Sequence, residues 1–298
     1  MDLSAAGHDP VLIEEVLQLL QVEPGQTVVD CTLGRAGHAS EITKRLGNAG
    51  LLIGLDADPR NLEFAQSRLA DAPCQVRLFH ANFAELGDVL EQAEHRTVDR
   101  ILADLGISTN QLFDESYGLS FAQDMPLDMR IDPRIAPNAA DLVNTMREED
   151  LANVLYELAQ ERYSRRIARK IVEARRQAPI TKTERLADLV RQAVPSRGYD
   201  KIDPATRTFM ALRMAVNREV ENLHALLEEA PKRLNSGGRF AVISFHSTED
   251  RLVKQAFRSA EQTGLLKVLT KKPISPTDAE IARNPRSRSA KLRVAEKL

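Results

Sequence analysis

The chain has 298 residues, 43% of them hydrophobic, so it is long enough to bury a real core in one large domain or two modest ones. Its 41 Lys and Arg residues nearly balance its 43 Asp and Glu residues, and the net charge of −2 excludes a global positive field that attracts nucleic acid. The two cysteines, Cys31 and Cys74, are too few for a disulfide-stapled secreted fold and too far apart for a zinc knuckle.

The N-terminal sequence MDLSAAGHDP has no basic start followed by an apolar core, and no run of about 18 apolar residues occurs in the chain. We therefore expect a cytoplasmic protein with no membrane partner. Both thiols are expected to be reduced and buried.

The first hundred residues alternate between helical and strand patterns. Apolar residues recur at helical spacing from Val11 to Leu20, and Pro24-Gly25 ends that helix before a short strand at 27–31. The elements expected next are a helix at 39–46, a strand at 51–56, a helix at 59–69, a strand at 76–80, a helix at 83–94 and a strand from Ile101. This order predicts right-handed crossovers and a parallel sheet, with ligands outside the carboxyl ends of its strands.

After Gly106, about a hundred residues carry helical patterns without a convincing strand, which predicts an inserted helical domain. The alternation resumes with a helix at 217–234, a turn at 235–238, a strand at 239–245 and a helix from about Glu249. The polar segment 273–288 is expected to be a mobile loop, and 290–295 a last edge strand. The predicted fold is an α/β domain formed by 1–113 and 215–298, with an all-helical insertion at 114–214.

The segment VVDCTLGRAGHASEI, from Val28 to Ile42, is a strand that runs through a glycine-containing loop into a helix. Such a turn presents backbone amides to a ligand, although glycines also close ordinary strand-to-helix turns. Asp56 strengthens the ligand-binding interpretation because it ends the next strand, 19 residues after Gly37, where a carboxylate accepts hydrogen bonds from a ribose diol.

Two further strand ends carry candidate ligand-binding residues. Phe83, which follows Asn82 beyond the third strand, could cover an adenine with its ring, or could pack as a hydrophobic staple at a helix start. Asp104 ends the fourth strand and has the alternative role of capping the following turn. Together with Asp56, these side chains mark successive strand ends along one edge of the sheet.

The loop GRAGHA distinguishes between two classes of cofactor. A nicotinamide dinucleotide usually needs three close glycines facing its pyrophosphate, whereas S-adenosylmethionine has no phosphate and needs an anchor for its amino-acid part. The loop has a single tight turn, and Asp30 and Asp104 offer carboxylates to an ammonium group and a positive sulfonium. The sequence therefore favours S-adenosylmethionine.

Over nearly its whole length the sequence resembles a known family, the bacterial 16S ribosomal RNA (cytosine-N4)-methyltransferases of the RsmH or MraW type. The matching segments are HDPVL at His8, DCTLGRAGHAS at Asp30, LDADP at Leu55, ILADLGIS at Ile101, YGLSF at Tyr117, PLDMR at Pro126, PATRTFMALRMAVN at Pro204, ISFHSTEDR at Ile243 and NPRSRSAKLR at Asn284. The resemblance implies a class I S-adenosylmethionine-dependent methyltransferase fold, Rossmann-like with a mostly parallel sheet, that carries a helical insertion for substrate recognition.

The resemblance also implies an activity and a set of site residues. The activity is methyl transfer from S-adenosylmethionine to N4 of a cytosine in 16S ribosomal RNA of the small ribosomal subunit, with no metal. The residues implied to contact the cofactor are Ala36, Gly37, His38, Asp56, Phe83, Asp104 and Gln111. Asp104 is the expected catalytic residue, acting through its field and by accepting a hydrogen bond from the amine during direct transfer.

The chain departs from the family pattern near one of these residues. Thr109, Asn110 and Phe113 replace residues that relatives often carry as Ser, Pro and Asp, and Met125 stands where a glycine usually precedes PLDMR. Because glycine tolerates a positive φ and methionine rarely does, Met125 is expected to alter a turn. Because Thr109, Asn110 and Phe113 flank Gln111, these departures also affect its assignment as a contact of the cofactor.

The fifth strand ends in SFHSTEDR, where Ser244 or His246 could contact the target base. The alternative is structural: Ser247 caps the next helix, and Asp250 forms a surface pair with Arg251. For His38 we expect a role in the loop instead of metal ligation, because no second ligand lies nearby in the sequence.

RNA contact is expected from local basic patches. The segment ERYSRRIARKIVEARR, 161–176, has seven basic residues and two acidic ones, and NPRSRSAKLR adds a second cluster. A solvated helix face is the usual meaning of such a run, and core packing is the usual role of Tyr117, Phe121 and Tyr163, the candidate stacking residues. Two other functions stay open: methylation of another RNA base or a protein side chain, and non-catalytic RNA binding during ribosome assembly.

Overall fold

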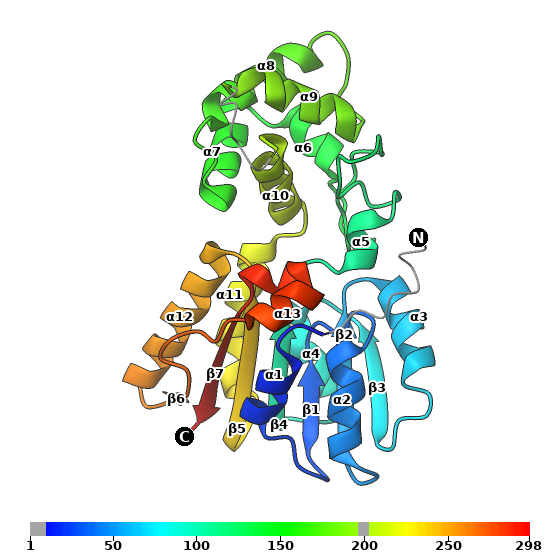
Figure 1. Ribbon diagram of the computed structural model, residues 1–298, viewed down its shortest axis with the longest axis vertical. Coiled ribbons are helices and arrows are strands. Elements are labelled where there is room, and N and C mark those ends of the chain that lie inside the picture. The colour runs from blue at the N-terminus through cyan, green and yellow to red at the C-terminus, as the bar shows by residue number, and fades with distance from the viewer. Residues whose placement is uncertain (1–9, 196–202) are drawn as a thin grey trace. The chain divides into compact units, whose positions relative to one another are not determined.

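The computed structural model describes residues 10–195 and 203–298, and these divide into two compact units (Figure 1). The first unit combines the segments up to Gly106 and from Val220 onward, and the second unit is Ile107–Glu219. The domain limits expected from the sequence, 113/114 and 214/215, fall inside the second unit. Each unit has a hydrophobic core of its own.

The first unit contains a seven-stranded sheet in the order β3-β2-β1-β4-β5-β7-β6. Its strands are β1 Thr27–Asp30, β2 Leu51–Asp56, β3 Gln75–His80, β4 Val98–Asp104, β5 Leu234–Ser244, β6 Leu266–Val268 and β7 Lys291–Lys297. The first five strands run parallel, and β7 pairs antiparallel with both β5 and β6. The sheet is therefore mostly parallel, as the sequence predicted.

The middle of the sheet holds a topological switch point. The chain goes from β1 outward to β2 and β3, then returns to place β4 on the other side of β1. In open α/β sheets, ligands bind outside the carboxyl ends of the strands at such a point. Asp30 and Asp104, the last residues of β1 and β4, stand there.

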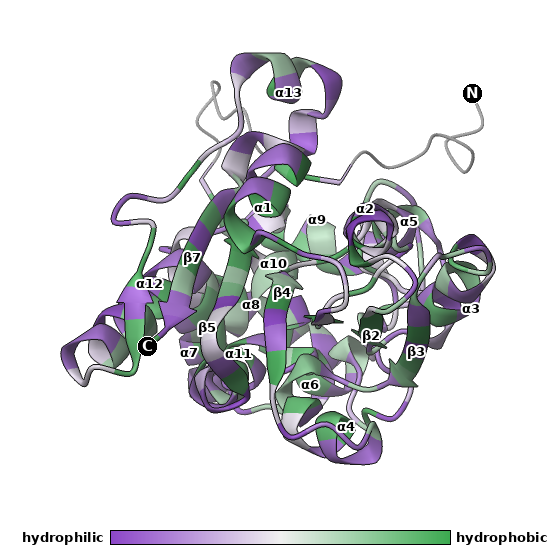
Figure 2. Ribbon diagram, turned by 90° about the horizontal axis from the view of Figure 1, so that it is seen from below, coloured by the Kyte–Doolittle hydropathy of each residue, from purple (hydrophilic) through white to green (hydrophobic). Residues whose placement is uncertain are grey.

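Helices cover both faces of this sheet. One face packs against α1 Ile13–Leu20, α2 Gly37–Leu46 and α3 Pro59–Arg68; the other packs against α4 Leu86–Gln92, α11 Glu219–Glu229 and α12 Ser247–Gln262. A strand covered on both faces must be apolar throughout. All six residues of β2 are buried, and it is hydrophobic over most of its length (Figure 2).

The second unit is helical in its described part. It contains α5 Thr109–Phe113, α6 Ala139–Thr145, α7 Glu148–Ala159, α8 Ser164–Arg175, α9 Thr183–Ala193 and α10 Ala205–Val216. The described residues include no strand, only an isolated bridge between Pro126 and Lys182. Helix α8 buries Ile167, Ala168 and Ile171, whose spacing of three to four residues puts them on one face.

The C-terminal part of the sheet differs from the prediction. The strand expected at 290–295 lies between β5 and β6 and is not an edge strand; the edge is β6, which the sequence did not suggest. Three residues give too short a pattern to recognise. The segment 273–288, expected to be a loop, contains the helix α13 Asp278–Arg283 and the 3₁₀ turn η3 Pro285–Ser289.

Other element limits also shift. The helix expected at 217–234 is α11, which ends at Glu229 and is followed by the 3₁₀ turn η2 Ala230–Lys232. The turn expected at 235–238 lies within β5, as an irregularity in its pairing with β4 where Gly237 has φ 75°. No helix among residues 10–195 and 203–298 has the length and apolar character needed to span a membrane.

Candidate functional site

Three carboxylates follow one another at the carboxyl edge of the parallel sheet. Asp56, Asp30 and Asp104 are the last residues of β2, β1 and β4, which are neighbours in that order. All three have a raised pKa, in each case chiefly because burial disfavours the charged form. Carboxyl groups with shifted pKa values that lie together at a topological switch point are candidates for ligand binding.

Asp30 is 1% exposed and only half satisfied. Its Oδ1 accepts a hydrogen bond of 3.1 Å from the Thr32 backbone N–H, whereas no described residue donates a hydrogen bond to its buried Oδ2. Burial raises the pKa of Asp30 to about 7, and the nearby charge of Asp56 adds to this effect. A cationic or hydrogen-bond-donating ligand at Oδ2 would remove this cost.

Asp104 has the same deficiency on the adjacent strand. Its backbone N–H donates to Thr32 Oγ1 at 2.6 Å, but its buried Oδ1 has no partner among the described residues. Burial, followed by the charges of Asp30 and Glu249, raises the pKa of Asp104 well above its ordinary value. The ends of β1 and β4 thus carry two buried carboxylate oxygens that have no hydrogen-bond donor in the described structure.

The loop after β1 crosses over the end of β2. Leu33 N–H donates to Leu55 C=O at 2.9 Å, and Gly34 N–H donates to Asp56 Oδ2 at 2.7 Å. Gly54 makes this approach possible, because a Cβ on it would lie 2.9 Å from methyl carbons of both Leu33 and Leu78. The sequence GRAGHA was correctly interpreted as a strand-to-helix turn.

The loop delivers the N-terminus of α2 without a cap. Ala36 is the N-cap residue and has a left-handed conformation at φ 59°, and no side chain of residues 10–195 or 203–298 bonds the first-turn amides. Gly37 follows, where a Cβ would come within 3.3 Å of Pro10. Uncapped N–H groups at a helix start are donors for a bound ligand.

His38 lies in the first turn of α2 and is 6% exposed. Its Nε2 is 2.9 Å from the Val11 carbonyl oxygen, so this nitrogen carries the proton and donates. Nδ1 then presents its lone pair toward Asp104 Oδ2, 3.7 Å away. Burial lowers the pKa of His38 to about 4, so the ring is neutral at physiological pH.

Asp56 supports the loop as well as facing the edge of the sheet. Its two oxygens accept hydrogen bonds from Gly34 N–H at 2.7 Å and Asp58 N–H at 2.8 Å, and Asn61 Nδ2 lies 3.4 Å from both. Burial raises the pKa of Asp56 to about 6. A ribose diol at Asp56 would compete with the two long contacts from Asn61, which are the weakest of these interactions.

Asn82 and Phe83 follow β3 as predicted. Asn82 caps the 3₁₀ turn η1 Phe83–Glu85: its Oδ1 accepts from Ala84 N–H at 3.0 Å, and its own N–H donates to Glu85 Oε2 at 2.6 Å. Phe83 is half-buried and packs against the core beneath α4. Core packing therefore occurs, and the adenine contact stays a prediction.

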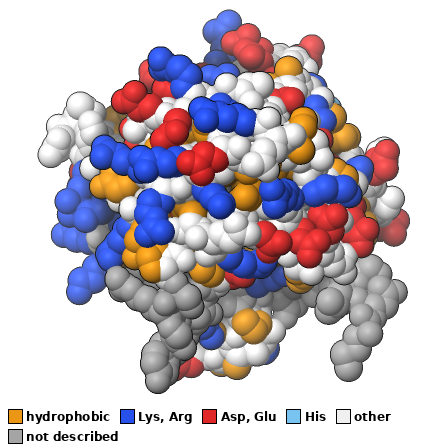
Figure 3. All heavy atoms as spheres, turned by 90° about the horizontal axis from the view of Figure 1, so that it is seen from above, with side chains coloured by type: hydrophobic (Ala, Val, Ile, Leu, Met, Phe, Trp, Pro, Cys, Tyr) orange, Lys and Arg blue, Asp and Glu red, His pale blue; other side chains and the backbone are white. Residues whose placement is uncertain are grey.

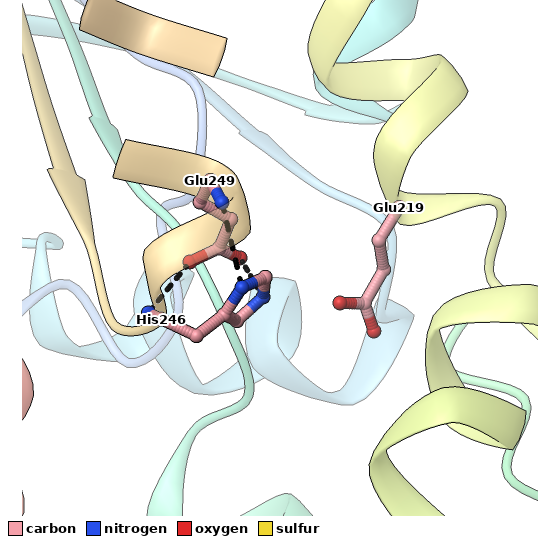
Figure 4. Close-up of side chains that lie close together, drawn as sticks. All are labelled: Glu219, His246 and Glu249. Atoms are coloured by element: carbon pink, nitrogen blue, oxygen red, sulfur yellow. Dashed lines mark hydrogen bonds and ion pairs between the residues drawn. The ribbon is translucent and has the colours of Figure 1, made fainter. Parts of the chain in front are cut away.

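The end of β5 has a different arrangement from the one expected. Helix α12 is capped by His246, not by Ser247: His246 Nδ1 accepts from Glu249 N–H at 3.4 Å, and its Nε2 lies 3.0 Å from Glu249 Oε1 (Figure 4). Ser244 is 1% exposed, and its Oγ lies 3.5 Å from the Lys291 carbonyl oxygen.

The prediction that Asp250 pairs with Arg251, made as part of the structural alternative for this segment, was wrong. Asp250 Oδ1 instead accepts from Arg293 Nε at 2.7 Å, and its Oδ2 lies 3.4 Å from Lys291 Nζ. The pairing β5·β7 places these cations beside α12, which sequence adjacency could not reveal.

Two residues of this edge were not predicted. Thr32 bonds both Asp30 and Asp104, and no motif marked it. Glu249 is buried and accepts from Phe245 N–H at 2.9 Å, and its charge acts on Asp104. Its position three residues after the N-cap His246 was the available signal, since a Glu there completes a capping box.

Two expectations concern the second unit. Gln111 is buried, and its Oε1 accepts from Ser108 N–H at 3.0 Å at the start of α5. Met125 is not among the residues with positive φ, so methionine fits there without strain; Met129 has that conformation instead, at φ 65°. Met125 is fixed by Thr183, which bonds both its N–H and its C=O.

The basic segment 161–176 contains the whole of α8, whose polar face is exposed (Figure 3). Arg162, Arg165, Arg166, Arg169 and Arg176 are exposed. The candidate stacking residues pack in the core: Tyr117 is 7% exposed, and Phe121 meets Phe209 edge to face with centroids 4.7 Å apart. Tyr163 also packs against this core.

Comparison with known proteins matches the whole chain. The model of the MraW methylase family covers residues 5–298. The protein named ribosomal RNA small subunit methyltransferase H of Acidobacterium capsulatum is 48% identical, with 97% of this chain and 98% of that protein aligned. Proteins of the same name from Geobacter sulfurreducens and Clostridioides difficile are 45% and 40% identical, and each alignment covers 98% of this chain and 99% of the relative.

Proposed function

The chain belongs to the MraW methylase family, and we propose that it transfers a methyl group from S-adenosylmethionine to N4 of a cytosine in 16S ribosomal RNA. One observation in the structure carries the proposal: the unpartnered, buried oxygens Asp30 Oδ2 and Asp104 Oδ1 at the switch point of the sheet. An ammonium group or a sulfonium in this place neutralises carboxylates that are otherwise costly to ionise.

The donor set fits S-adenosylmethionine. When bound, this cofactor supplies an electrophilic methyl group on a positively charged sulfur. We assign its amino-acid part to the loop and helix start at Ala36, Gly37 and His38, whose first-turn amides lack a side-chain cap. Asp56 is assigned to the ribose diol. Phe83 at the adenine and Gln111 remain assignments from the family resemblance.

Asp104 is the proposed catalytic residue. The N4 lone pair of cytosine is conjugated with the ring, so the site must hold the amine through its N–H bonds while the lone pair turns toward the methyl carbon. Asp104 Oδ1 is free to accept such a bond, and the raised pKa of Asp104 suits it to take up the proton that the amine loses. Ser244 and His246 as contacts of the base stay predictions.

No covalent enzyme intermediate is needed. Burial raises the pKa of the Cys31 thiol well above its ordinary value, and it also raises the pKa of Cys74. Both thiols are therefore held in the unreactive protonated form. Direct transfer within a single displacement is the mechanism that the residues support.

RNA binding is assigned to the helical insertion, 114–214. Its helix α8 exposes arginines that can neutralise phosphates while the opposite face is fixed in the core. We propose 16S ribosomal RNA, presented by the small ribosomal subunit in the cytoplasm, as the partner. No metal enters this mechanism.

Radiolabelled S-adenosylmethionine, incubated with methylation-naive small subunits or their RNA and followed by nucleoside analysis, tests the proposal. Label is expected in N4-methylcytidine. Asp104→Asn should lower kcat by about 100-fold or more, the scale of losing one preorganised electrostatic contact. The control Asp71→Asn changes an exposed carboxylate. Label in protein or in another nucleoside, or a folded Asp104→Asn enzyme of full activity, contradicts the proposal.

A further inference from the structure

A pocket in the first unit is lined by residues of α12, β6 and β7 and of the segment after β6. Figure 1 shows these three elements at one side of the sheet. The volume of the pocket is about 240 Å³, and it is lined by Lys254, Phe257, Arg258, Glu261, Val268, Thr270, Lys271 and Arg293. None of these residues belongs to the edge of the sheet that holds Asp30 and Asp104. Helix α12 connects the two places: it begins at Ser247, and Lys254 and Arg258 follow ~10 and ~16 Å along its axis.

The lining is strongly cationic. Lys254, Arg258 and Lys271 have no hydrogen bond or ion pair with the described part of the chain. Glu261 is the only acid among the lining residues, and its Oε1 accepts from the Val268 backbone N–H at 3.0 Å. Four cations thus line the pocket against one acid, and the pocket carries an excess of positive charge.

Arg293 is the most informative residue of the pocket. Its side chain is only 6% exposed, and its Nε donates to Asp250 at 2.7 Å. Neither terminal nitrogen of its guanidinium has a partner within residues 10–195 and 203–298. Four of the five N–H donors of this guanidinium are therefore available to an acceptor from outside the chain.

The other residues that line the pocket also favour an anionic ligand. Thr270 is occupied by its own backbone neighbour, since its Oγ1 accepts from Val294 N–H at 2.8 Å and lies 3.4 Å from Val294 C=O. Phe257 and Val268 are apolar. The pocket therefore offers many donors and few free acceptors, which suits a phosphate oxygen and disfavours a cation.

We propose that this pocket binds a backbone phosphate of the RNA substrate, in the same unit as the edge of the sheet that carries Asp104. The inference rests on the proposed function, because a chain of net charge −2 must hold RNA through local patches. Lys254 and Arg258 lie one helical turn apart on the helix that starts at the carboxyl edge of the sheet, so they form a row leading away from it.

Neutralising single pocket cations in the full-length protein tests this proposal. Arg258→Gln and Lys271→Gln are compared with Lys267→Gln, which removes the same charge from an exposed residue of β6 outside the pocket. Binding of a fluorescent single-stranded RNA fragment of the small-subunit ribosomal RNA is measured over a range of salt. Each pocket variant should weaken binding about threefold to tenfold and flatten the salt slope by about 0.7, the value for one lost contact to a single strand.

The control variant and the binding of S-adenosylmethionine distinguish the possible outcomes of this experiment. Lys267→Gln should change RNA affinity less than about twofold, and all variants should bind S-adenosylmethionine as the wild type does. Equal losses in pocket and control variants, or no loss in either, overturn the proposal. Stabilisation of the wild type by inorganic phosphate, with RNA affinity unchanged in the variants, also overturns it in favour of a small-anion site. If labelled RNA shows no N4-methylcytidine while the pocket variants still lose RNA affinity, the proposed function fails and the phosphate site stands.

Discussion

The acidic residues at the carboxyl edge of the sheet lower the stability of the free protein but favour the binding of a cationic ligand. Asp30 is buried and Asp104 half-buried, and each has one buried oxygen without a donor in the described structure, so ionising them in the free protein is unfavourable. The same deficiency makes them good acceptors for a cationic ligand. A residue that serves binding in this way should be replaceable with a gain in stability.

Asp30→Asn should therefore stabilise the free protein at pH 8. The pKa of Asp30 rises from 3.8 to about 7 on folding, so the folded state keeps a proton that the unfolded chain has lost. The free energy of unfolding then falls as the pH rises from about 4 to about 7, and the full cost, on the order of 4 kcal/mol, is present above pH 7. Urea unfolding at pH 8 should show a higher midpoint.

The control for this variant is Asp71→Asn, at an exposed position. It should leave the midpoint within experimental error, as surface substitutions usually do. At pH 4 the advantage of Asp30→Asn should vanish, because the native Asp30 is then protonated. An Asp30→Asn protein less stable than the wild type at pH 8 would contradict the account of Asp30 as an unsatisfied acid.

Cofactor affinity should fall as the pH is lowered from about 8 to about 6. Asp30, with a pKa of about 7, and Asp56, with a pKa of about 6, gain protons in this range, and the charged form that attracts the cationic groups is lost. The decline approaches tenfold per pH unit for each proton that binding must displace. His38 does not contribute, since its pKa of about 4 keeps it neutral. Calorimetric titration with S-adenosylmethionine measures the profile.

Adenosine, which lacks both cationic groups, is the matched ligand for this experiment. Its affinity should depend on pH only through Asp56. A flat profile for S-adenosylmethionine from pH 8 to 6, or equal profiles for both ligands, would show that Asp30 does not meet a cation.

At the residue scale, the sequence identified the acids but not their state. Asp30, Asp56 and Asp104 could be placed because each ends a strand in an alternating pattern. Their unpaired oxygens depend on what packs against them in three dimensions, which no local pattern contains. For the same reason Thr32 escaped notice, since its role arises only when β1 and β4 pair.

At the level of elements, α8 shows that one residue type serves two purposes on one helix. Arg175 donates to the carbonyl oxygens of Val143 and Met146 at 2.7 Å each, at the C-terminal end of α6. Arg165 and Arg166 are exposed and have no partner in the described structure. The first arginine is structural, and the other two are available to phosphates.

Charge reversal and truncation on α8 should separate these roles. Arg165→Glu and Arg166→Glu should weaken RNA binding and reduce its salt dependence without changing the unfolding midpoint. Arg175→Ala should destabilise the protein by about 1–3 kcal/mol, because two carbonyls lose a charged donor. Fluorescence anisotropy with RNA and urea unfolding measure both quantities in each variant. Loss of stability in all three variants would make α8 a purely structural element.

Element prediction was successful where patterns were long and failed where they were short. The parallel strands were recognised because apolar runs alternate with helices of sufficient length. The three-residue β6 and the helix α13, with six residues, are stabilised by tertiary contacts that override a polar sequence. Leu12 N–H, for example, donates to Glu280 Oε1 at 2.8 Å, which fixes α13 to a segment 268 residues away.

For the whole molecule, the chain carries separate cores in its two units. The sheet of the first unit is covered on both faces, and the helices of the second unit surround a core of their own. The sequence predicted this division from the loss of strand patterns after Gly106. Its limits were harder to locate, because α5 belongs to the second unit but ends just before the first predicted boundary, and α10 continues across the second.

Hydrogen exchange should therefore report S-adenosylmethionine in the first unit alone, whereas RNA should also be reported in the second unit. Ordering by a ligand is local when each core is independent, so S-adenosylmethionine should slow exchange in peptides covering 31–38 and 104–106 of the first unit. A single-stranded RNA should slow exchange in peptides of α8, through its exposed arginines. Mass spectrometry of the protein with each ligand alone measures both effects, with α4 as a reference on the opposite side of the sheet from α2. Equal slowing by S-adenosylmethionine across α7, α8 and α9 would mean that the second unit also responds to the cofactor, and the assignment of the cofactor to the first unit alone would then be wrong.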